Sequence, residues 1–597
     1  MHLSRRAVAA VALGAVALTA ALVASPASDG GRKASVAPRL RTLAPGRRVP
    51  VLVVLRPAAA SSSPRRLARA GGAVALVDGL RRQARVAQAP LIARLRRLGV
   101  PFRSYWLANV VALRADRSLV QALARRDDVS AVVPDAAVRE RLEPVRRTAA
   151  RRTAIEWGVE KIGAPVVWAR GVEGQEIVVG VPDSGFEWEH PALRAQYRGT
   201  GADGAVVHDY NWHDAVHADI DGNGANPCGF STRAPCDDDG HGTFAAGLAV
   251  GRDGGEEIGV APRARLVGCR TMDNGVGRPS TYLECLQFFL APTDLTGSNP
   301  DPSRRVDVVS NSWVCPPDEG CDALVLQPAV DAMRAAGIFM AAAAGNDGPA
   351  CASIRYPPPI YDGVFTVGNA QADDTIRASS SRGPVTVDGS GRPKPDVVAP
   401  GTNVMSARPG GTYGTGSGTS FASPHVAGAV ALLWSAFPSL RHDVDRTERL
   451  LRESAVPIRT TDGCGGDALT QVPNETYGSG RIQVEAAYER AAAEAPDTTA
   501  PVVSGLVVSA TGKGVRRVVA LRFRLSEAAR VTARLERRAG SRWVAAGAPV
   551  VADRAAGAAA VRAVRALRPG SYRATAQPRD RAGNVGATVR AGFRVRA

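Results

Sequence analysis

Three patterns that would assign the chain to a common class are missing from its 597 residues. Beyond the first 30 residues there is no uninterrupted apolar run near the roughly 18 residues that a membrane helix needs, so no membrane span is expected in the mature chain. The eight cysteines form no C-x-x-C pair, and their spacing fits a zinc site poorly. The sequence has no G-x-S-x-G segment, which excludes the nucleophile turn of α/β-hydrolase esterases.

Residues 1–27 have the pattern of a secretory signal peptide. Arg5 and Arg6 precede an apolar run over residues 7–24, and the small residues of Ser-Pro-Ala at 25–27 follow as a cleavage site. The alternative is a transmembrane anchor, but the run is short and no stop-transfer charges follow it. We therefore expect a secreted, extracellular protein.

The net charge of +19 is distributed in blocks along the chain. Residues 31–150 hold 25 Lys and Arg against 7 Asp and Glu, a net charge of +18. Residues 151–496 hold 28 against 43, a net charge of −15, and residues 497–597 hold 20 against 5, a net charge of +15. This distribution is not the uniform basicity of a protein that binds nucleic acid, so no nucleic-acid partner is expected.

Three short segments carry candidate catalytic residues. In residues 418–428, Gly-Thr-Ser-Phe-Ala-Ser-Pro-His-Val-Ala-Gly, Ser420 precedes an apolar helical run, so it lies near a helix N-terminus that favours negative charge. Asp183 ends an apolar strand, and His241 opens a second helix of small residues. The order Asp, His, Ser is one of the chain orders in which a catalytic triad occurs.

Each of these residue types has a chemical role in such a triad. The hydroxyl of Ser420 would attack a peptide carbonyl, His241 would take its proton, and Asp183 would hold the imidazole in the required tautomer. Taken singly, Ser420 could be a helix N-cap and Asp183 a turn residue, so the prediction depends on all three together. His425 is closer to Ser420 in sequence, but we interpret it as a structural hydrogen-bonding residue within the serine motif.

Asn346 is the candidate for stabilising the oxyanion. It follows the run Ala-Ala-Ala-Ala-Gly at residues 341–345, and its side-chain amide could act with the backbone N–H of Ser420. The simpler alternative is a Gly-Asn turn.

Together these motifs resemble the subtilisin-like serine proteases, the subtilases. The opening segment at residues 155–165 and the sequence Ser-Asn-Ser-Trp at 310–313 are most similar to bacillopeptidase F-like members. The resemblance implies that extended peptides bind along one strand and face an opposite wall of the main specificity pocket. The residues implied for that role are Ser310, Asn311, Ser312, Ala343 and Gly345. Three residues depart from the family pattern. Pro182 directly precedes Asp183, Phe244 stands where many members have a second histidine, and Phe421 stands where methionine is frequent.

Apolar strands alternate with helices of small residues through residues 150–492. The strands are expected at residues 176–181, 265–270, 306–310, 337–343 and 363–367. The alternation predicts an α/β fold, a parallel sheet with helices on both faces and functional residues at the carboxyl ends of the strands. The same subtilisin-like catalytic domain is implied by the resemblance.

A small α+β domain is expected at residues 45–140. Strands at residues 51–55, 105–113 and 127–135 and helices at 65–97 and 119–124 indicate it. Its ending, Asp-Val-Ser-Ala-Val-Val-Pro-Asp, resembles the propeptide inhibitor of subtilases, which implies that the protease binds its own propeptide. The arginine-rich residues 139–152 are the expected region of cleavage.

A β-sandwich-like domain of immunoglobulin or fibronectin type is expected at residues 500–597. Alternating stretches such as residues 519–525 read as half-exposed strands. The positive charge suggests contact with an acidic cell wall or polysaccharide, and plain solubility explains it equally well.

All eight cysteines fall within the catalytic domain. Disulfide bonds are expected in an exported protein, and short loops favour three pairs, with the fourth remaining. The pairs are Cys228–Cys236, Cys315–Cys321, Cys269–Cys285 and Cys351–Cys464.

A calcium ion is the one cofactor that the sequence suggests, and the chemistry needs none. Asp219, Asp221 and Asn223 offer oxygen ligands at alternate positions around a glycine turn. The loop lacks the downstream glutamate of an EF-hand, and an acidic surface loop is the alternative.

The sequence as a whole predicts a secreted serine endopeptidase that is made as a zymogen, processes itself, and cuts proteins or peptides through an acyl-enzyme on Ser420. The alternative is an inactive extracellular protein that binds surfaces through its basic C-terminal domain.

Overall fold

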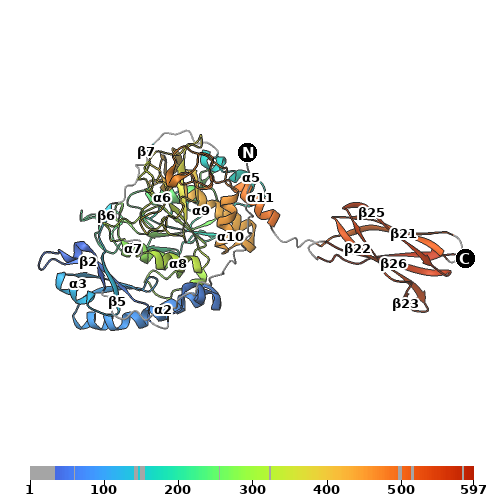
Figure 1. Ribbon diagram of the computed structural model, residues 1–597, viewed down its shortest axis with the longest axis horizontal. Helices are drawn as coiled ribbons and strands as arrows, with labels where there is room; N and C mark the ends of the chain where they lie inside the picture. The colour runs from blue at the N-terminus through green and yellow to red at the C-terminus, as the bar shows by residue number, and fades with distance from the viewer. Residues whose placement is uncertain are drawn as a thin grey trace, which may run out of the picture. The chain divides into compact units, whose positions relative to one another are not determined.

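The computed structural model describes residues 34–58, 61–139, 146–147, 155–254, 256–321, 325–494, 500–512, 516–580 and 584–596. The predicted signal peptide and most of the predicted cleavage region lie outside these ranges. The chain divides into two compact units, Met1–Ala491 and Ala492–Ala597 (Figure 1). In the described ranges, no helix is long and apolar enough to cross a membrane.

The first unit begins with a small α+β subdomain, residues 34–139. Its elements are β1 (Ser35–Val36), α1 (Pro38–Arg41), β2 (Val49–Leu55), α2 (Pro64–Arg97), β3 (Phe102–Tyr105), β4 (Val110–Ala115), α3 (Arg117–Ala124) and β5 (Val129–Pro134). The strands form one sheet in the order β1-β5-β2-β4-β3. Both long helices start at polar caps, since Ser63 Oγ accepts from the backbone N–H of Arg66 and Asp116 Oδ1 from that of Leu119.

One predicted strand of this subdomain is wrong in its extent. The sequence indicated a single strand over residues 105–113, but β3 ends at Tyr105 and β4 begins at Val110. Asn109 has a φ of 53°, and its side-chain amide donates to the carbonyls of Leu55 and Arg56. The chain therefore turns here because a neighbouring strand provides hydrogen-bond acceptors, which an apolar pattern does not reveal.

The rest of the first unit is built on a seven-stranded parallel sheet. Its strands are β8 (Val178–Asp183), β9 (Trp212–Asp214), β12 (Arg265–Arg270), β14 (Val308–Asn311), β15 (Phe339–Ala343), β16 (Phe365–Ala370) and β17 (Val397–Pro400). They lie in the order β17-β16-β15-β14-β8-β12-β9, and every neighbouring pair is parallel. The sheet confirms the predicted fold class.

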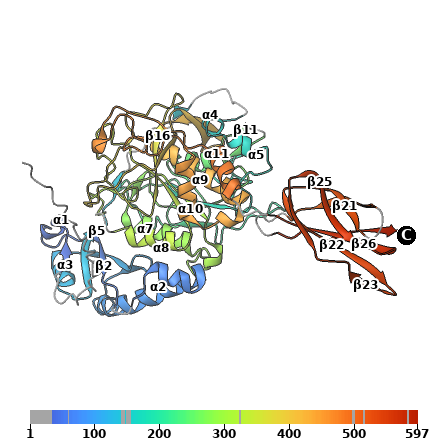
Figure 2. The same ribbon diagram turned by 45° about the vertical axis from the view of Figure 1, so that its right-hand side comes forward.

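Helices cover both faces of this sheet (Figure 2). The helices are α6 (His241–Val250), α7 (Pro279–Leu290), α8 (Gln327–Ala335), α9 (Thr419–Ala436), α10 (Val444–Glu453) and α11 (Val484–Glu494). Val309 packs in the core with α7 and α8, whereas its neighbour Val308 packs in the core with α6, α9 and α10. Successive strand residues thus point to opposite faces, as a strand buried on both sides requires.

Shorter elements complete the first unit. They are β6 (Val138–Arg139), β7 (Arg146–Arg147), α4 (Trp157–Lys161), α5 (Ala164–Trp168), β10 (Arg252–Asp253), β11 (Glu256–Glu257), β13 (Val276–Gly277), β18 (Val404–Arg408) and β19 (Thr412–Gly416), with 3-10 turns at Pro302–Arg304, Pro438–Leu440 and Cys464–Gly466.

The α+β subdomain shares an apolar core with helices α7 and α8 (Figure 1). Leu76 and Val77 of α2 are buried in the same cluster as Val330 and Met333 of α8. Burial of apolar surface is the main favourable term in such contacts, so this shared core holds the subdomain on the rest of the first unit, residues 155–491, which we call the sheet domain.

Four disulfide bonds link the cysteines in the predicted pairs. Three close short loops, and Cys351–Cys464 joins residues 113 positions apart in sequence. The longest loop removes the most entropy from the unfolded chain in the usual account of disulfide stabilisation.

The second unit is made of β-strands. They are β20 (Val503–Thr511), β21 (Arg516–Leu525), β22 (Ala529–Ala539), β23 (Arg542–Ala545), β24 (Val550–Arg554), β25 (Gly557–Ala566), β26 (Gly570–Arg579) and β27 (Val589–Val595). One sheet has the order β20-β21-β25, and the other joins β23, β22, β26 and β27, with β24 beside β22. Inward residues of both sheets, such as Phe523 and Val531, share one core, so the unit is a two-sheet β structure as predicted.

Candidate active site

Asp183 and His241 meet at the carboxyl edge of the parallel sheet. Asp183 is the last residue of β8, and His241 is the first residue of α6. The Nδ1 atom of His241 lies 2.8 Å from Oδ1 of Asp183, and the side chains are 2% and 0% exposed. A buried carboxylate at this distance fixes the ring orientation and makes Nδ1 the protonated nitrogen.

The surroundings of His241 favour its charged form. Burial disfavours the imidazolium, but the negative charge and the hydrogen bond of Asp183 outweigh that effect, and Asp239 and Asp237 add to it. Together they raise the pKa of His241 to about 9. The second ring nitrogen, Nε2, is buried and has no hydrogen-bond partner among the described residues. This atom is therefore the one available to exchange a proton with a nucleophile.

Asp237 ties the two segments together, and the sequence analysis did not single it out. Its Oδ1 accepts hydrogen bonds from Ser184 Oγ and the backbone N–H of Gly240, both at 2.8 Å. Its other oxygen accepts from the backbone N–H of Thr243 in the first turn of α6, also at 2.8 Å. Burial raises the pKa of Asp237 in spite of these bonds. An acidic residue just before a helix of small residues is the pattern that could have identified it.

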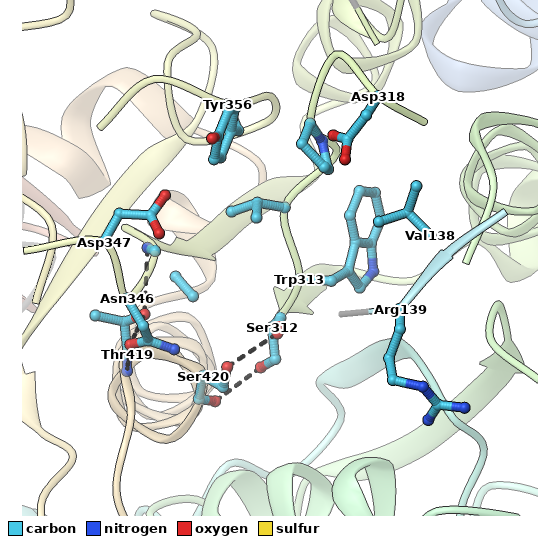
Figure 3. Close-up of a pocket in the computed structure, with 14 residues that line it drawn as sticks. Val138, Arg139, Ser312, Trp313, Asp318, Asn346, Asp347, Tyr356, Thr419 and Ser420 are labelled. Carbon is cyan, nitrogen blue, oxygen red and sulfur yellow. Dashed lines mark hydrogen bonds between the residues drawn. The ribbon is translucent and has the colours of Figure 1, made fainter. Parts of the chain in front are cut away.

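Ser420 lies in the first turn of α9, as predicted (Figure 3). Its hydroxyl donates to the backbone carbonyl of Ser312 at 3.0 Å, and Ser312 Oγ donates back to the Ser420 carbonyl at 2.8 Å. Within α9 the Ser420 carbonyl would normally bond to the residue four positions later, but Pro424 has no N–H to offer. The proline therefore leaves an acceptor that Ser312 satisfies, and this contact joins the end of β14 to the serine.

Asn346 lies in the loop after β15 and, like Ser420, lines a cavity at the carboxyl edge of the sheet (Figure 3). Its Oδ1 accepts from the backbone N–H and from the hydroxyl of Thr419, each at 3.0 Å. With the oxygen held in this way, the two amide N–H bonds are left for other acceptors. The N-terminus of α9 adds a positive dipole end at the same place.

A cavity of about 130 Å³ lies beside Ser420 (Figure 3). Three of the residues that the resemblance implied for substrate binding, Ser312, Ala343 and Gly345, line it. Ser310 and Asn311 are not among its lining residues, since both lie within buried β14, where the Asn311 amide donates to the Trp313 carbonyl at 2.8 Å.

Further lining residues were not predicted. They are Val138, Arg139, Trp313, Val314, Pro316, Asp318, Asp347, Tyr356 and Thr419. Trp313 ends the motif Ser-Asn-Ser-Trp and Asp347 directly follows Asn346, so adjacency could have identified both as lining residues. Asp318 and Tyr356 come from loops without a recognisable pattern.

The end of the α+β subdomain reaches this cavity (Figure 3). Val138 and Arg139 form β6, which pairs antiparallel with Val276 and Gly277 of β13. Just before it, the backbone N–H of Ala136 donates to the Glu319 carbonyl at 2.8 Å. The described chain thus reaches the cavity as a short, extended, hydrogen-bonded strand, the conformation in which peptides add to a sheet edge.

A comparison with protein families matches residues 174–480 to the Subtilase family (Peptidase_S8). That region is more than half of the chain. The chain belongs to the subtilase family. The match includes Asp183, His241, Asn346 and Ser420, and the family is one of subtilisin-like serine proteases.

Individual subtilases from bacilli are also similar to the chain. Bacillopeptidase F of Bacillus subtilis (strain 168) is 33% identical over 394 residues, which cover 64% of this chain and 26% of that protein. Subtilisin E of the same strain is 28% identical over 341 residues, covering 56% and 73%. Subtilisin DY of Bacillus licheniformis is 30% identical over 337 residues, covering 56% and 98%. The chain thus spans about a quarter of the length of bacillopeptidase F and most of the length of the subtilisins.

The three departures from the subtilase pattern have structural counterparts. The rings of Phe244 and Phe421 lie 4.4 Å apart, and the Phe421 ring lies 5.3 Å from the imidazole of His241. Phe244 and Phe421 therefore pack on one another, and Phe421 also packs against the ring of His241. Pro182 has no N–H, and its carbonyl accepts from the indole N–H of Trp313 at 2.8 Å.

His425 has the structural role that its place in the serine motif indicated. It is fully buried, and its Nδ1 lies 2.9 Å from the Phe421 carbonyl one turn earlier in α9.

The predicted calcium ligands are only partly brought together. Carboxylate oxygens of Asp219, Asp221 and Asp273 lie within 4.8 Å of one another. Asn223 instead supports the turn, because its Oδ1 accepts from the backbone N–H of Ala225 at 2.7 Å and its amide donates to Asp221. Three convergent carboxylates fit a hard cation such as Ca²⁺. Asp273 was missed because it comes from a separate loop after β12.

Proposed function

We propose that the chain is a secreted subtilisin-like serine endopeptidase that is synthesised as a zymogen. The observation that carries this proposal is the buried pair of Asp183 and His241 at the sheet edge where Ser420 and Asn346 line one cavity. The position of Ser420 at a helix N-terminus supports a nucleophile whose product is an anion.

In the proposed reaction, Ser420 Oγ turns from the Ser312 carbonyl toward Nε2 of His241 and gives it a proton while attacking the peptide carbonyl. The resulting oxyanion accepts hydrogen bonds from the Asn346 amide and the Ser420 backbone N–H. His241 then protonates the leaving amine, and the acyl group remains on Ser420. Water attacks this ester with His241 as base, which releases the acid and restores the serine.

The α+β subdomain is proposed to be the propeptide, an intramolecular partner of the protease. Its shared apolar core with α8 supports this role, as does the strand β6 beside the cavity. The buried Asp135 adds a polar contact, since its Oδ1 accepts from the backbone N–H of Ser280 at the start of α7 at 3.0 Å. A strand that fills the substrate cleft would inhibit the enzyme until it is cut and released.

Export and a cell-surface partner complete the proposal. The predicted signal peptide and the four disulfide bonds support an extracellular location. The basic C-terminal unit is proposed to contact acidic cell-wall polymers or polysaccharide. If that contact were the only function, the chain would be an inactive surface-binding protein.

The experiment that separates these functions compares the purified full-length chain with its Ser420→Ala variant. We expect the wild-type chain to shorten itself and to be labelled by a serine-directed phosphonate, and the variant to do neither. If the two chains behave identically, the enzyme proposal fails and the surface-binding function remains.

A structural calcium ion is proposed at Asp219, Asp221 and Asp273, where it would offset the repulsion of three carboxylates. Chelation should lower the thermal unfolding midpoint of the Ser420→Ala chain. Asp273→Asn should remove that difference, and a midpoint that is the same with and without chelator would refute the calcium site.

A further inference from the structure

A cluster of two histidines and one glutamate lies on the face of α7 that meets the α+β subdomain. His213 is in β9, His217 follows in the next loop, and Glu284 lies in the middle of α7. The Nε2 atoms of both histidines are 2.8 Å from Oε1 of Glu284. The two histidines lie four residues apart, whereas Glu284 comes from a separate helix, and none of the three belongs to the candidate active site.

Neighbouring side chains fix the orientation of both imidazoles. The Nδ1 atom of His217 lies 2.7 Å from Ser231 Oγ, so the hydroxyl can hold the tautomer that leaves Nε2 with a lone pair. The His213 ring is stacked on Phe288, with centroids 5.2 Å apart and planes 21° apart. Because the side chains of His213, His217 and Glu284 are only 18%, 26% and 13% exposed, little rotamer freedom remains to be lost on binding a ligand.

The donor set selects among metal ions. Two imidazoles and one carboxylate are the ligands of many catalytic zinc sites and leave one tetrahedral position for water. Calcium prefers oxygen ligands alone, so this set discriminates against it. Tetrahedral coordination with bonds of about 2.0–2.1 Å places donor atoms about 3.3 Å apart. Each 2.8 Å contact would therefore lengthen by about half an ångström, which a small side-chain rotation provides.

The α+β subdomain places a cation at the same point. Nη1 of Arg103, in β3, lies 2.9 Å from Oε2 of Glu284, and the hydroxyl of Tyr105 donates to the same oxygen at 3.2 Å. A guanidinium beside the carboxylate repels a dication and uses the oxygen lone pairs that the dication needs.

We propose that His213, His217 and Glu284 form a zinc-binding site that Arg103 blocks while the α+β subdomain is docked. Zinc and the subdomain then compete for one carboxylate. By linkage, whatever weakens the hold of Arg103 on Glu284 tightens zinc binding, and zinc in turn weakens the hold of the subdomain.

Zinc chloride is titrated by calorimetry into the full-length Ser420→Ala chain, in excess calcium so that acidic surface sites are saturated. With Arg103→Leu added, we expect one zinc per chain, bound at least about tenfold more tightly than with Arg103 present. His217→Ala or Glu284→Gln in that background should weaken binding at least about 100-fold. Because the nucleophile is absent, the result is independent of the proposed protease activity.

Two further variants keep the experiment decisive. His208→Gln removes an imidazole outside the cluster and should leave zinc affinity within about twofold. Ser231→Ala changes only the partner of His217 and should lower the zinc affinity about tenfold, and it can be measured even if the ligand variants do not fold.

Replacement of zinc by Co²⁺ should give the intense visible absorption of tetrahedral cobalt. The site is refuted if the Arg103→Leu chain binds no zinc, or if zinc binding is insensitive to His217 and Ser231. Equal affinity with and without Arg103 would refute the competition.

Discussion

The sheet domain and the C-terminal β unit differ in how many polar side chains they bury and in how those side chains are paired. In the sheet domain, Arg270 is fully buried and pairs with Asp214 at 2.8 Å and Asp238 at 3.1 Å. In the described part of the C-terminal unit, Asp580 is the one buried polar side chain. Two ion pairs lie in the described part of this unit: the side chains of Arg530 and Asp553 are 63% and 73% exposed, and those of Arg573 and Glu536 are 32% and 27% exposed.

The cost of burying charge explains why this difference matters. An unpaired buried charge is strongly destabilising, so a fold retains buried ionisable groups only where they are paired or have a function. The sheet domain has such groups at its carboxyl edge, where the proposed chemistry takes place. The core of the C-terminal unit is made of the inward apolar residues of its alternating strands. Its charges should therefore matter little to catalysis.

The largest expected effect is a difference in kcat/KM between variants of two buried aspartates of the sheet domain. Asp183→Asn preserves shape but no longer holds the His241 tautomer, so kcat/KM should fall by about 10⁴-fold with little change in stability. Asp214→Asn should leave the rate within about tenfold and lower the free energy of unfolding by about 1–3 kcal/mol, because Arg270 loses one partner.

Hydrolysis of a chromogenic peptide would measure the change in kcat/KM, and denaturant unfolding would measure the change in stability. Equal loss of rate in both variants would mean that buried charge acts through stability alone, and the functional distinction between the two aspartates would fail.

The next effect concerns Asn346. Asn346→Ala should lower kcat by roughly 10²- to 10³-fold with KM nearly unchanged, because the amide acts on charge that develops only in the transition state. Thr419→Val removes one of the two donors to Asn346 Oδ1 and should cost less than about tenfold, since the Thr419 backbone N–H remains. Steady-state hydrolysis of a chromogenic peptide distinguishes them. A raised KM with normal kcat would assign Asn346 to substrate binding instead.

The pH dependence should reflect the carboxylates around His241. The imidazole must be neutral to act as base, and its raised pKa means that kcat/KM falls as the pH drops through a value above 6.5. For any pKa above about 7, the rate rises at least about fourfold between pH 6.5 and 8. Asp239→Asn removes one nearby negative charge and should move the midpoint downward. A midpoint at or below 6.5, unmoved by that variant, would contradict this account.

Local patterns were sufficient to predict the sheet and to place Asp183, His241 and Ser420 at the ends of strands and helices. Asp183 and His241 sit where an apolar strand ends and a helix of small residues begins, and such ends are marked in the sequence itself. The parallel strands are buried on both faces and therefore appear as continuous apolar runs. The disulfide pairs could be predicted because three of them close short loops.

Contacts between distant segments could not be predicted in the same way. The hydrogen bond from the Ser420 hydroxyl to the Ser312 carbonyl joins two segments that only the folded chain brings together. The same is true of the contact of Asp273 with Asp219 and Asp221. The turn at Asn109 follows from acceptors on β2. The two histidines of the Glu284 cluster lie four residues apart, but the glutamate that joins them lies 67 and 71 residues further along the chain.

The smallest effect should come from removing the C-terminal unit. Deletion of residues 500–597 should leave kcat/KM within about twofold and the stability of the sheet domain within about 0.5 kcal/mol, because the β unit has its own core. A deletion that begins at Val484 is the matched control. It removes α11, whose residues Val484, Ala487 and Ala491 are buried in the sheet-domain core, and should cost several kcal/mol.

Thermal unfolding and peptide hydrolysis of the two truncated chains make this test. If the shorter deletion lowered the rate more than tenfold, catalysis would depend on the basic unit, and the contrast between the two regions would not hold. If it instead abolished retention on an acidic polysaccharide and spared the rate, catalysis and surface binding would be assigned to separate units of the chain.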